Sequence, residues 1–247
     1  MKRFVIGDIH GRYDALIEVF QLSNFNYETD KLIILGDIAD GGIDSYKVVE
    51  ELLKIKNYIF CIGNHDIWLK NHFETGIIEK VWYNQGGKAT IESYKKAGFV
   101  KDGKIQSPET HLQFFRKAHW YHIEDENKLF VHGGIEPDKP ISQQQKLTIL
   151  WDRELIKYAR KQPIPNWEYV FVGHTTTQTY KNYPNVANEF EPIKFNNLYI
   201  MDCGAGWDGK LAIMNIDTFE FYTSKKQTPV RNPETNLINK PIKLIFK

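Results

Sequence analysis

Five short apolar segments of this chain each end in glycine beside an aspartate, an asparagine or a histidine, and this recurrence constrains the fold most. An apolar run that stops at glycine is typical of a buried β-strand followed by a sharp turn. In open α/β sheets, ligands bind at the carboxyl ends of the strands. The segments that follow the five strands are Gly7-Asp8-Ile9-His10-Gly11, Gly36-Asp37-Ile38-Ala39-Asp40-Gly41-Gly42, Gly63-Asn64-His65-Asp66, His132-Gly133-Gly134 and Gly173-His174-Thr175.

Strands and helices alternate through the first quarter of the sequence. Apolar spacing predicts strands at Arg3–Ile6, Lys31–Leu35 and Asn57–Ile62, with helices at Tyr13–Leu22 and Ser45–Lys56 between them. This order predicts parallel βαβ units, and therefore an α/β protein.

After a mostly helical middle, the second half of the chain is expected to form a second, mixed sheet. Residues 66–121 have a mostly helical pattern, and a short terminal strand is expected at Ile242–Phe246. Further strands are expected at His119–Ile123, Lys128–Val131, Tyr169–Val172, Leu198–Met201, Lys210–Ile216 and Phe219–Thr223.

Composition narrows the class of protein. The chain has 247 residues, 42% hydrophobic and 26% charged, which is typical of a globular protein with a sizeable core. A net charge of +1 gives no field that attracts polyanions, so we expect no stable nucleic-acid binding. Without a signal-peptide pattern or a membrane-spanning run, we expect a cytoplasmic protein that does not bind membranes. Cys61 and Cys203 lie in apolar runs and are expected to be buried free thiols.

Six side chains in the strand-end segments form a donor set suited to divalent metal ions. They are Asp8, His10, Asp37, Asn64, His132 and His174. Mixed oxygen and nitrogen donors without a thiolate suit Mn, Fe, Zn, Ni or Co rather than soft metals or calcium. The set is too large for one catalytic ion with open positions, but it fits two ions if Asp37 bridges them. Such a pair polarises a phosphoryl group and generates a hydroxide nucleophile at neutral pH.

Each feature taken singly has a simpler explanation. A lone Gly-Asp pair is typical of a turn, and single histidines such as His111, His119 and His122 are typically structural or exposed. Five glycine-flanked polar segments after five separate strands are not explained in this way, because unpartnered polar groups at strand ends are costly.

These residues resemble the motifs of the calcineurin-like metallophosphoesterases. The resemblance is strongest to the phosphoprotein-phosphatase branch, which includes bacteriophage and bacterial serine/threonine phosphatases and symmetrical diadenosine tetraphosphatases. The family's pattern is GDxHG, GDxxDRG, GNHE or GNHD, a later histidine before small residues, and GHT, and this chain reads GDIHG, GDIADGG, GNHD, HGG and GHT. The resemblance implies a four-layer α/β/β/α sandwich of two mixed sheets. It also implies a single domain over residues 1–247, of which 224–247 form a C-terminal extension.

The resemblance further implies a role for each site residue. One ion would be held by Asp8, His10 and Asp37, and the other by Asp37, Asn64, His132 and His174, with Mn expected and Fe, Zn, Ni or Co as alternatives. Water or hydroxide on the metals would attack phosphorus in line. His65 would protonate the leaving oxygen and Asp40 would orient His65, which suits the pKa of a carboxylate-paired imidazole.

One position departs from the family's pattern. Gly41 replaces the arginine of GDxxDRG, which grips substrate phosphate, and glycine supplies neither its charge nor its bidentate geometry. Arg153, in Trp-Asp-Arg, resembles the family's other phosphate-binding arginine, and we expect Arg153 and Asn64 to bind substrate phosphate. The alternative for Arg153 is a surface ion pair with Asp152 or Glu154.

The missing arginine leaves two further questions. Arg12 or Lys88 could take its place, or its loss could open room for a phosphodiester, a nucleotide or a bulkier ester. The segment Asn84–Thr90, with Trp82 and Tyr83 before it, is expected to face the substrate, and a helix cap with core aromatics is the alternative.

Three hypotheses for function follow. The first is a metal-dependent phosphomonoesterase, most simply a serine/threonine or dual-specificity protein phosphatase, acting as a monomer or weak oligomer on phosphoprotein. The second is a dinucleoside-polyphosphate or cyclic-nucleotide phosphohydrolase, for which Gly41 is the motive. The third is a catalytically silent metal-binding module, which the His65–Asp40 pair disfavours because a binding module needs no proton donor.

Overall fold

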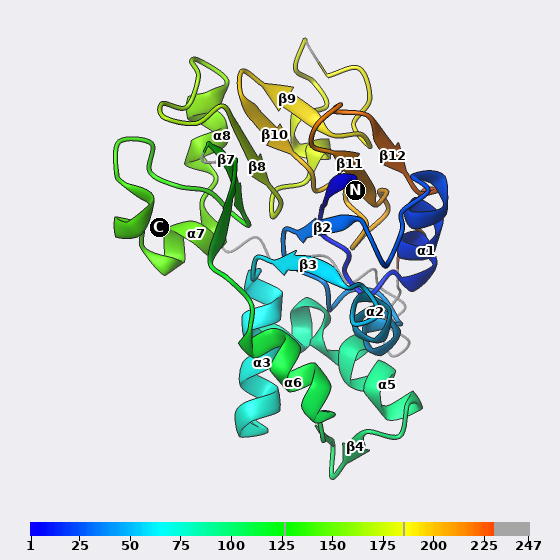
Figure 1. The fold of residues 1–247 in the computed structure, drawn as a ribbon. Helices are drawn as coiled ribbons and strands as arrows, with labels where there is room; N and C mark the ends of the chain where they lie inside the picture. The colour runs from blue at the N-terminus through cyan, green and yellow to red at the C-terminus, as the bar shows by residue number, and fades with distance from the viewer. Residues whose placement is uncertain (126, 185, 230–247) are drawn as a thin grey trace.

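Two five-stranded mixed sheets make up the centre of the computed structural model, which describes residues 1–125, 127–184 and 186–229 (Figure 1). The first sheet has the order β12-β11-β1-β2-β3. Strands β1 (Arg3–Ile6), β2 (Lys31–Ile34) and β3 (Asn57–Phe60) are parallel, as the βαβ pattern predicts. Strands β11 (Ala212–Asn215) and β12 (Phe221–Thr223) extend it with antiparallel pairing, so the expectation that both belong to the second sheet is wrong.

The second sheet has the order β6-β7-β8-β10-β9. Strands β7 (Lys128–Val131), β8 (Tyr169–Val172) and β10 (Leu198–Ile200) are parallel. Strands β6 (Tyr121–Glu124) and β9 (Ile193–Phe195) pair antiparallel at its two edges.

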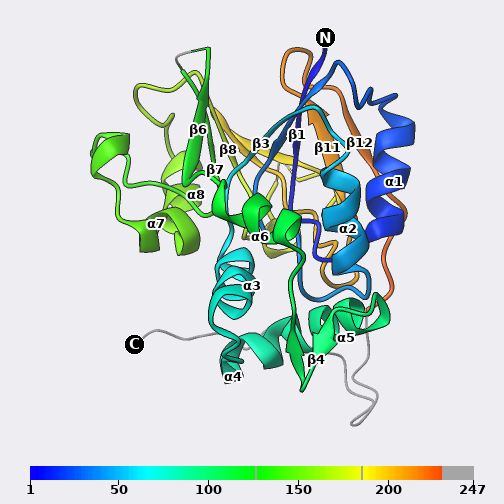
Figure 2. The same cartoon turned by 60° about the horizontal axis from the view of Figure 1, so that its bottom comes forward.

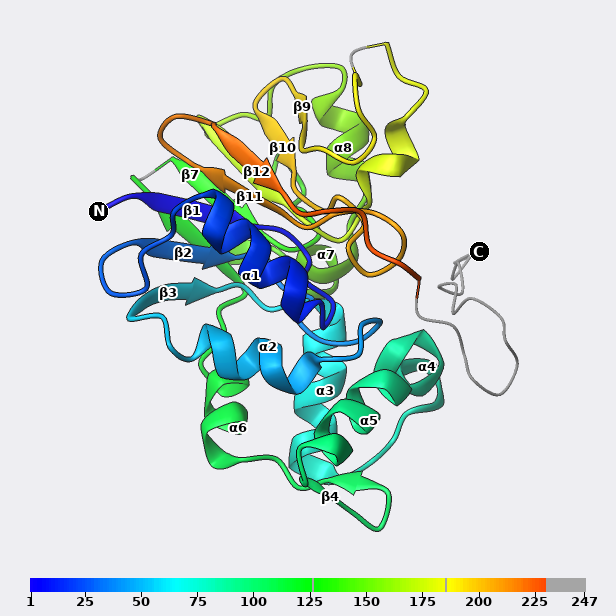
Figure 3. The same cartoon turned by 90° about the vertical axis from the view of Figure 1, so that its right-hand side faces the viewer.

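Helices cover the outer faces of both sheets. On the side of the first sheet are α1 (Tyr13–Leu22), α2 (Ser45–Leu52), α3 (Asn64–Thr75), α5 (Lys88–Lys96) and α6 (Glu109–Arg116), and on the side of the second are α7 (Lys146–Trp151) and α8 (Glu154–Ala159). Figure 2 shows α3, α5 and the short α4 (Lys80–Trp82) beyond the ends of β1–β3 that lie away from the N-terminus. Figure 3 shows α1 and α2 on one side of the paired sheets and α8 on the other.

Alternating side chains of the central strands fill three separate apolar layers. In β1, Phe4 and Ile6 pack under the helices of the first sheet, while Val5 points into the layer between the sheets. In β7, Leu129 packs under α7 and α8, while Phe130 joins Val5 in the central layer. Successive strand residues point to opposite faces, so strands buried on both faces become continuously apolar. This arrangement confirms the four-layer α/β/β/α sandwich.

The structure differs from the sequence-based expectations in a few elements. The helix from Ser45 ends at Leu52 rather than Lys56, because Lys54 bonds back three residues instead of four. A hairpin of β4 (Val100–Lys101) and β5 (Lys104–Ile105) interrupts the expected helical region, with Asp102 and Gly103 both at positive φ in its turn. Strand β9 was not predicted. The expected strand at Ile242–Phe246 lies outside the described residues.

The two cysteines lie in the layer between the sheets. Cys61 and Cys203 are free and buried, which confirms the expectation for both thiols. Within residues 1–125, 127–184 and 186–229, no helix combines the length and apolar character needed to cross a bilayer.

The central layer should dominate stability. Phe171 is fully buried there, and its ring stacks on Phe130 at 4.8 Å and on Tyr199 at 5.1 Å. We predict that Phe171→Ala lowers the free energy of unfolding by about 3–5 kcal/mol in chemical denaturation, because it leaves a cavity between two sheets. Phe221→Ala, at a ring 38% exposed in β12, is the matched control and should change the free energy by less than about 1 kcal/mol. Equal effects of the two substitutions would contradict this view of the core.

Candidate metal and active site

Three side chains from the first sheet meet at the carboxyl ends of β1 and β2. Asp8, His10 and Asp37 each offer one ligand atom, and these atoms all lie within 4.8 Å of one another. The Nε2 atom of His10 is 3.9 Å from Oδ2 of Asp37. The adjacent parallel strands β1 and β2 place these residues together, so the group can hold one metal ion.

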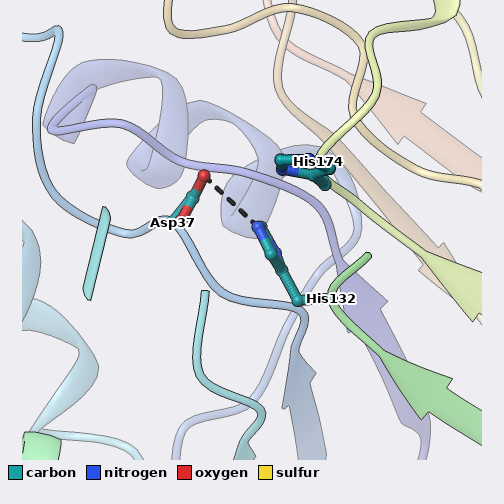
Figure 4. A group of neighbouring side chains, drawn as sticks. All are labelled: Asp37, His132 and His174. Carbon is teal, nitrogen blue, oxygen red and sulfur yellow. Dashed lines mark ion pairs between the residues drawn. The ribbon is translucent and has the colours of Figure 1, made fainter. Parts of the chain in front are cut away.

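A second group shares Asp37 and adds histidines from the second sheet. Figure 4 shows His132 and His174, which follow β7 and β8, turned toward Asp37. Their ligand atoms and that of Asp37 also lie within 4.8 Å of one another, and His132 Nε2 is 3.4 Å from Asp37 Oδ2. Asn64 joins this group, with Oδ1 3.1 Å from His132 Nε2. The structure therefore brings together all six predicted donors around a shared carboxylate.

Backbone carbonyls fix the tautomers of two of these histidines. Nδ1 of His10 is 3.1 Å from the carbonyl of Ala39, and Nδ1 of His132 is 2.7 Å from that of Leu35. A carbonyl can only accept, so each Nδ1 carries a proton, and Nε2 is the ring nitrogen that faces Asp37. This is the orientation that metal-binding histidines adopt when a carbonyl holds the other ring nitrogen.

The backbone of the site is locally strained. His10, Asp37, Asp40 and His174 all have positive φ, between 47° and 71°, a conformation that residues other than glycine seldom adopt. Such residues gather where the surrounding structure over-determines them, often at functional sites.

Glycines allow the strands to approach the carboxylates closely. A Cβ at Gly63 would lie 2.2 Å from Oδ1 of Asp37, and one at Gly173 would lie 2.1 Å from Oδ1 of Asp8. Neither distance is compatible with a side chain. The glycines recognised in the sequence therefore make room for the two acidic residues.

The charges and unpartnered atoms of the site fit divalent cations. Asp8 Oδ1 and His174 Nε2 are buried and have no hydrogen-bond partner among the described residues. Burial, and then the charge of nearby Asp202, raise the pKa of Asp8 well above its ordinary value. Burial lowers the pKa of His132, but the charge and hydrogen bond of Asp37, together with the charge of Asp8, outweigh burial and raise that pKa to about 10. Clustered buried carboxylates and inward-facing imidazoles are the donors that such cations require.

Beside the first group lies the pair of His65 and Asp40. His65 Nδ1 is 2.8 Å from Oδ2 of Asp40, and the His65 ring lies edge-on to His10 with centroids 5.0 Å apart. Asp40 is fully buried, whereas the His65 side chain keeps 13% of its surface exposed. Burial lowers the pKa of His65, but the charge of Asp37 and the hydrogen bond to Asp40 hold it above its ordinary value. The expected partners are therefore in contact.

Two residues of the described chain grip the same carboxylate. Trp82 Nε1 lies 2.9 Å and 3.1 Å from the two oxygens of Asp40, and the Thr90 hydroxyl donates to Oδ1 at 2.6 Å. Both residues are buried, so the expectation that the whole segment faces substrate is wrong for Trp82 and Thr90. Within that segment, Tyr83 and Asn84 are exposed.

Asp66 ties together the two loops that carry Asp37 and Asn64. Its Oδ2 accepts the N–H groups of Asp37 at 2.7 Å and Gly63 at 2.9 Å, and its Oδ1 accepts that of Ile38 at 3.0 Å. Burial and the charge of Asp37 raise the pKa of Asp66 to about 7. The sequence showed Asp66 only as the last letter of a motif, and its role depends on contacts with another strand.

The three basic residues considered for phosphate binding, Arg153, Arg12 and Lys88, have different surroundings. Arg153 is exposed, and its charge helps to lower the pKa of His174 after burial and His132, so it lies near the second group. Arg153 forms no ion pair within the described residues, and Glu154 pairs with Lys157 instead. Arg12 donates to the carbonyls of Ala205, Gly206, Trp207 and Thr228, so its guanidinium holds the 205–207 loop. Lys88 is half-buried at the start of α5.

Gly41 sits beneath that same loop. It has φ of +77°, and a Cβ on it would lie 3.2 Å from the carbonyl oxygen of Gly206. A Cβ at this position would require the loop backbone to shift by a few tenths of an ångström, and the positive φ would be strained for a residue other than glycine.

An aromatic row, which sequence reasoning missed, links the two halves of the site. The Trp68 ring lies 5.0 Å from His65 and 5.7 Å from Trp151, and the Trp151 ring lies 5.3 Å from His174. Both tryptophans are half-buried. Trp68 and Trp151 come from α3 and α7, so only the packing of the two halves could reveal the row.

A family model and known proteins match this chain over most of its length. The model described as calcineurin-like phosphoesterase matches residues 1–197. Serine/threonine-protein phosphatase 2 of Salmonella typhimurium is 26% identical over 86% of this chain and 92% of its own length. An asymmetrical bis(5′-nucleosyl)-tetraphosphatase of Bacillus cereus is 26% identical over 100% of this chain and 96% of its own.

Solved structures share the fold. A crystal structure of a candidate diadenosine tetraphosphatase superposes with a TM-score of 0.65. It covers 90% of this chain and 92% of its own, at 16% sequence identity. This likeness supports the sandwich architecture.

We predict that Asp66→Asn destabilises the site and the protein. At pH 8, above the pKa of Asp66, the carboxylate accepts three backbone N–H groups, and an amide would turn a donor toward at least one of them. The free energy of unfolding in urea should fall by about 1–3 kcal/mol. Asp138→Asn, at an exposed aspartate, should change it by less than about 0.5 kcal/mol. An Asp66→Asn protein as stable as the parent would contradict the role given to these bonds.

Proposed function

This chain belongs to the calcineurin-like phosphoesterase family and is a phosphoric ester hydrolase, and on that premise we propose that it hydrolyses phosphomonoesters, with phosphoserine and phosphothreonine in proteins as its substrates. The observation that carries the proposal is the His65–Asp40 pair, held at 2.8 Å beside the two acidic and imidazole groups that share Asp37. A proton donor next to a two-cation site suits esters whose leaving oxygen is strongly basic.

The leaving group supports protein substrates over nucleotide anhydrides. Hydrolysis of a phosphoserine or phosphothreonine ester expels an alkoxide, which needs a proton as the bond breaks. A nucleotide leaving through a phosphate oxygen is far less basic and needs that proton less. His65 can supply it, because Asp40 accepts from Nδ1 and leaves Nε2 as the ring's other protonation site.

The donor groups assign residues to two metal positions in this proposal. Asp8, His10 and Asp37 would hold one divalent cation, and Asp37, Asn64, His132 and His174 the other, with Mn the first choice. Bound there, a pair of divalent cations would withdraw charge from phosphoryl oxygens and make water more acidic. Carbonyl bonds to His10 and His132 fix both rings with Nε2 directed at Asp37 before any cation binds.

Arg153 and Asn64 bind the substrate phosphate in this proposal. Arg153 is exposed near His174 and unpaired within the described residues, so its guanidinium is available to phosphate oxygens. Arg12 is committed to backbone carbonyls, and it therefore does not replace the arginine missing at Gly41.

Dinucleoside tetraphosphate hydrolysis is the second candidate, and Gly41 favours it. Without the arginine, one side of the phosphate position lacks a bidentate clamp, which a compact monoester would miss more than an extended polyphosphate. The Bacillus cereus relative carries the name of such an enzyme. The silent binding module is no longer a candidate, since family membership establishes a hydrolase.

We predict that Asp37→Asn abolishes loading of both metal positions. Asp37 belongs to both groups, so its loss should weaken Mn²⁺ binding at each by more than about tenfold. Metal analysis after incubation with Mn²⁺ and desalting should give close to two ions per parent chain and close to none per variant. Asp208→Asn, at an exposed aspartate, should keep the parent's content. Two ions retained by Asp37→Asn would remove that residue from the bridge.

A substrate panel tests the function itself. With Mn²⁺ present, kcat/KM for a phosphoserine peptide should exceed that for diadenosine tetraphosphate by about tenfold or more. The reverse order would favour the second candidate, and the products would then identify symmetrical or asymmetrical cleavage. If neither substrate reacts although p-nitrophenyl phosphate does, both candidates are wrong and a different phosphoester is the substrate.

A further inference from the structure

The carboxylate of Asp40 is held by more donors than orientation of one histidine requires. Beyond His65 at 2.8 Å, it receives the indole N–H of Trp82 at both oxygens and the hydroxyl of Thr90 at Oδ1. The three residues that make the bonds at Trp82 and Thr90 are buried: Asp40 and Thr90 are 0% exposed and Trp82 is 1% exposed. Water does not share these bonds, so each protein donor counts fully.

The proton positions in this set follow from chemistry. A carboxylate only accepts, so the Thr90 hydroxyl uses its one proton to donate a hydrogen bond to Oδ1 of Asp40. Thr90 Oγ1 is then free to accept the Asp40 N–H at 3.0 Å and the Ser45 hydroxyl at 3.0 Å. Thr90 therefore clamps both the backbone and the side chain of Asp40, a residue with φ of +71°. One side chain fixes the position of Asp40 and the rotation of its carboxylate.

The Trp82 ring packs against a second buried ring. Its ring lies 4.9 Å from the ring of His72, which is buried in α3. The N–H of Ile105 donates to His72 Nε2 at 3.1 Å, so His72 carries its proton on Nδ1 and donates to the carbonyl of Ile77 at 3.0 Å. The indole therefore packs against a histidine ring that is itself fixed by two hydrogen bonds.

We propose that Thr90 and Trp82 are positioning residues, which act through Asp40 to aim the proton of His65 at the leaving oxygen. The proposal rests on the role given to His65 in the proposed function. With Oδ1 occupied by Thr90 and the indole N–H placed between the oxygens, Oδ2 is left facing His65 in one orientation. The hydrogen bond to Oδ2 then fixes the orientation of the His65 imidazole, and a small rotation of the ring would direct its proton away from the leaving oxygen.

A purely structural role and a positioning role differ in their dependence on the leaving group. Loss of an aligned proton donor slows esters with basic leaving groups far more than esters with acidic ones. General damage to the fold slows both equally. Phenyl phosphate and p-nitrophenyl phosphate are phosphomonoesters of similar size that differ chiefly in the acidity of the phenol released. The ratio of their kcat values therefore reports proton delivery.

The main variant is Thr90→Val, which keeps the shape of the side chain and removes its hydroxyl. In the Mn²⁺-loaded full-length protein, we expect kcat for phenyl phosphate to fall by about tenfold or more relative to p-nitrophenyl phosphate, with little change in KM for either. Thr90→Ser restores the hydroxyl and should return the ratio close to the parent value. Trp82→Phe, which keeps an aromatic ring and removes the N–H, should shift the ratio in the same direction as Thr90→Val.

Ser93→Ala is the matched control. Ser93 is buried in the same helix, one turn after Thr90, and its hydroxyl accepts the N–H of Tyr46 without touching Asp40. It should lower the melting temperature and leave the ratio of kcat values unchanged. Melting temperature and bound Mn²⁺ are measured for every variant, so that loss of fold or metal is recognised.

His65→Asn separates failure of this inference from failure of the proposed function. If His65→Asn leaves the ratio at the parent value, His65 is not the proton donor and the premise itself is wrong. If His65→Asn lowers kcat for phenyl phosphate relative to p-nitrophenyl phosphate while folded Thr90→Val and Trp82→Phe do not, only the positioning inference is overturned. An equal loss on both substrates in Thr90→Val, without rescue by Thr90→Ser, would likewise reduce Thr90 to a structural residue.

Discussion

The packing of the two sheets against each other is the constraint on which the site depends. Asp8 and Asp37 follow strands of the first sheet, whereas His132 and His174 follow strands of the second. Oδ2 of Asp8 accepts the N–H of His174 at 2.9 Å, and Oδ2 of Asp37 faces Nε2 of His132 at 3.4 Å. These contacts depend on the central apolar layer, in which Val5 and Ile33 of the first sheet pack with Phe130 and Phe171 of the second. A dry core thus places polar groups where neither sheet alone could gather them.

Bringing these groups together places several buried acidic side chains close to one another. Asp8, Asp66 and Asp202 all have raised pKa values, with burial as the largest cause and neighbouring carboxylates adding to it. Three backbone N–H groups offset the cost for Asp66, and Asp202 accepts the N–H of Gly204. Asp8 keeps an unpartnered oxygen. The remaining imbalance is of the kind that divalent cations relieve, and the family of this chain is one that uses them.

A loop and an aromatic row lie at the rim of this centre. Gly41 lies under the 205–207 loop, which Arg12 holds through three of its carbonyls. The half-buried Trp68 and Trp151 form an aromatic row from His65 to His174. Gly41 and the loop backbone therefore lie so close together that a Cβ at this position would require the loop to shift slightly. The motifs shared with phosphatases and tetraphosphatases alike lie deeper and do not discriminate between these substrates.

The sequence by itself predicted most of the strands and the donor residues, because apolar alternation and glycine at strand ends are properties of near neighbours in the chain. The sequence also implied the four-layer fold, through its resemblance to the motifs of a known family. It also carried one overlooked local signal, Asp102-Gly103, which turns the β4–β5 hairpin. Only the tertiary structure decided that Thr90 and Trp82 close around Asp40, that Asp66 ties two loops, and that Asp202 adds its charge to the site. Thr90 lies fifty residues from Asp40 in the chain. No periodicity reports a hydrogen bond of that separation, since the loop after β2 and helix α5 come together only in the folded structure.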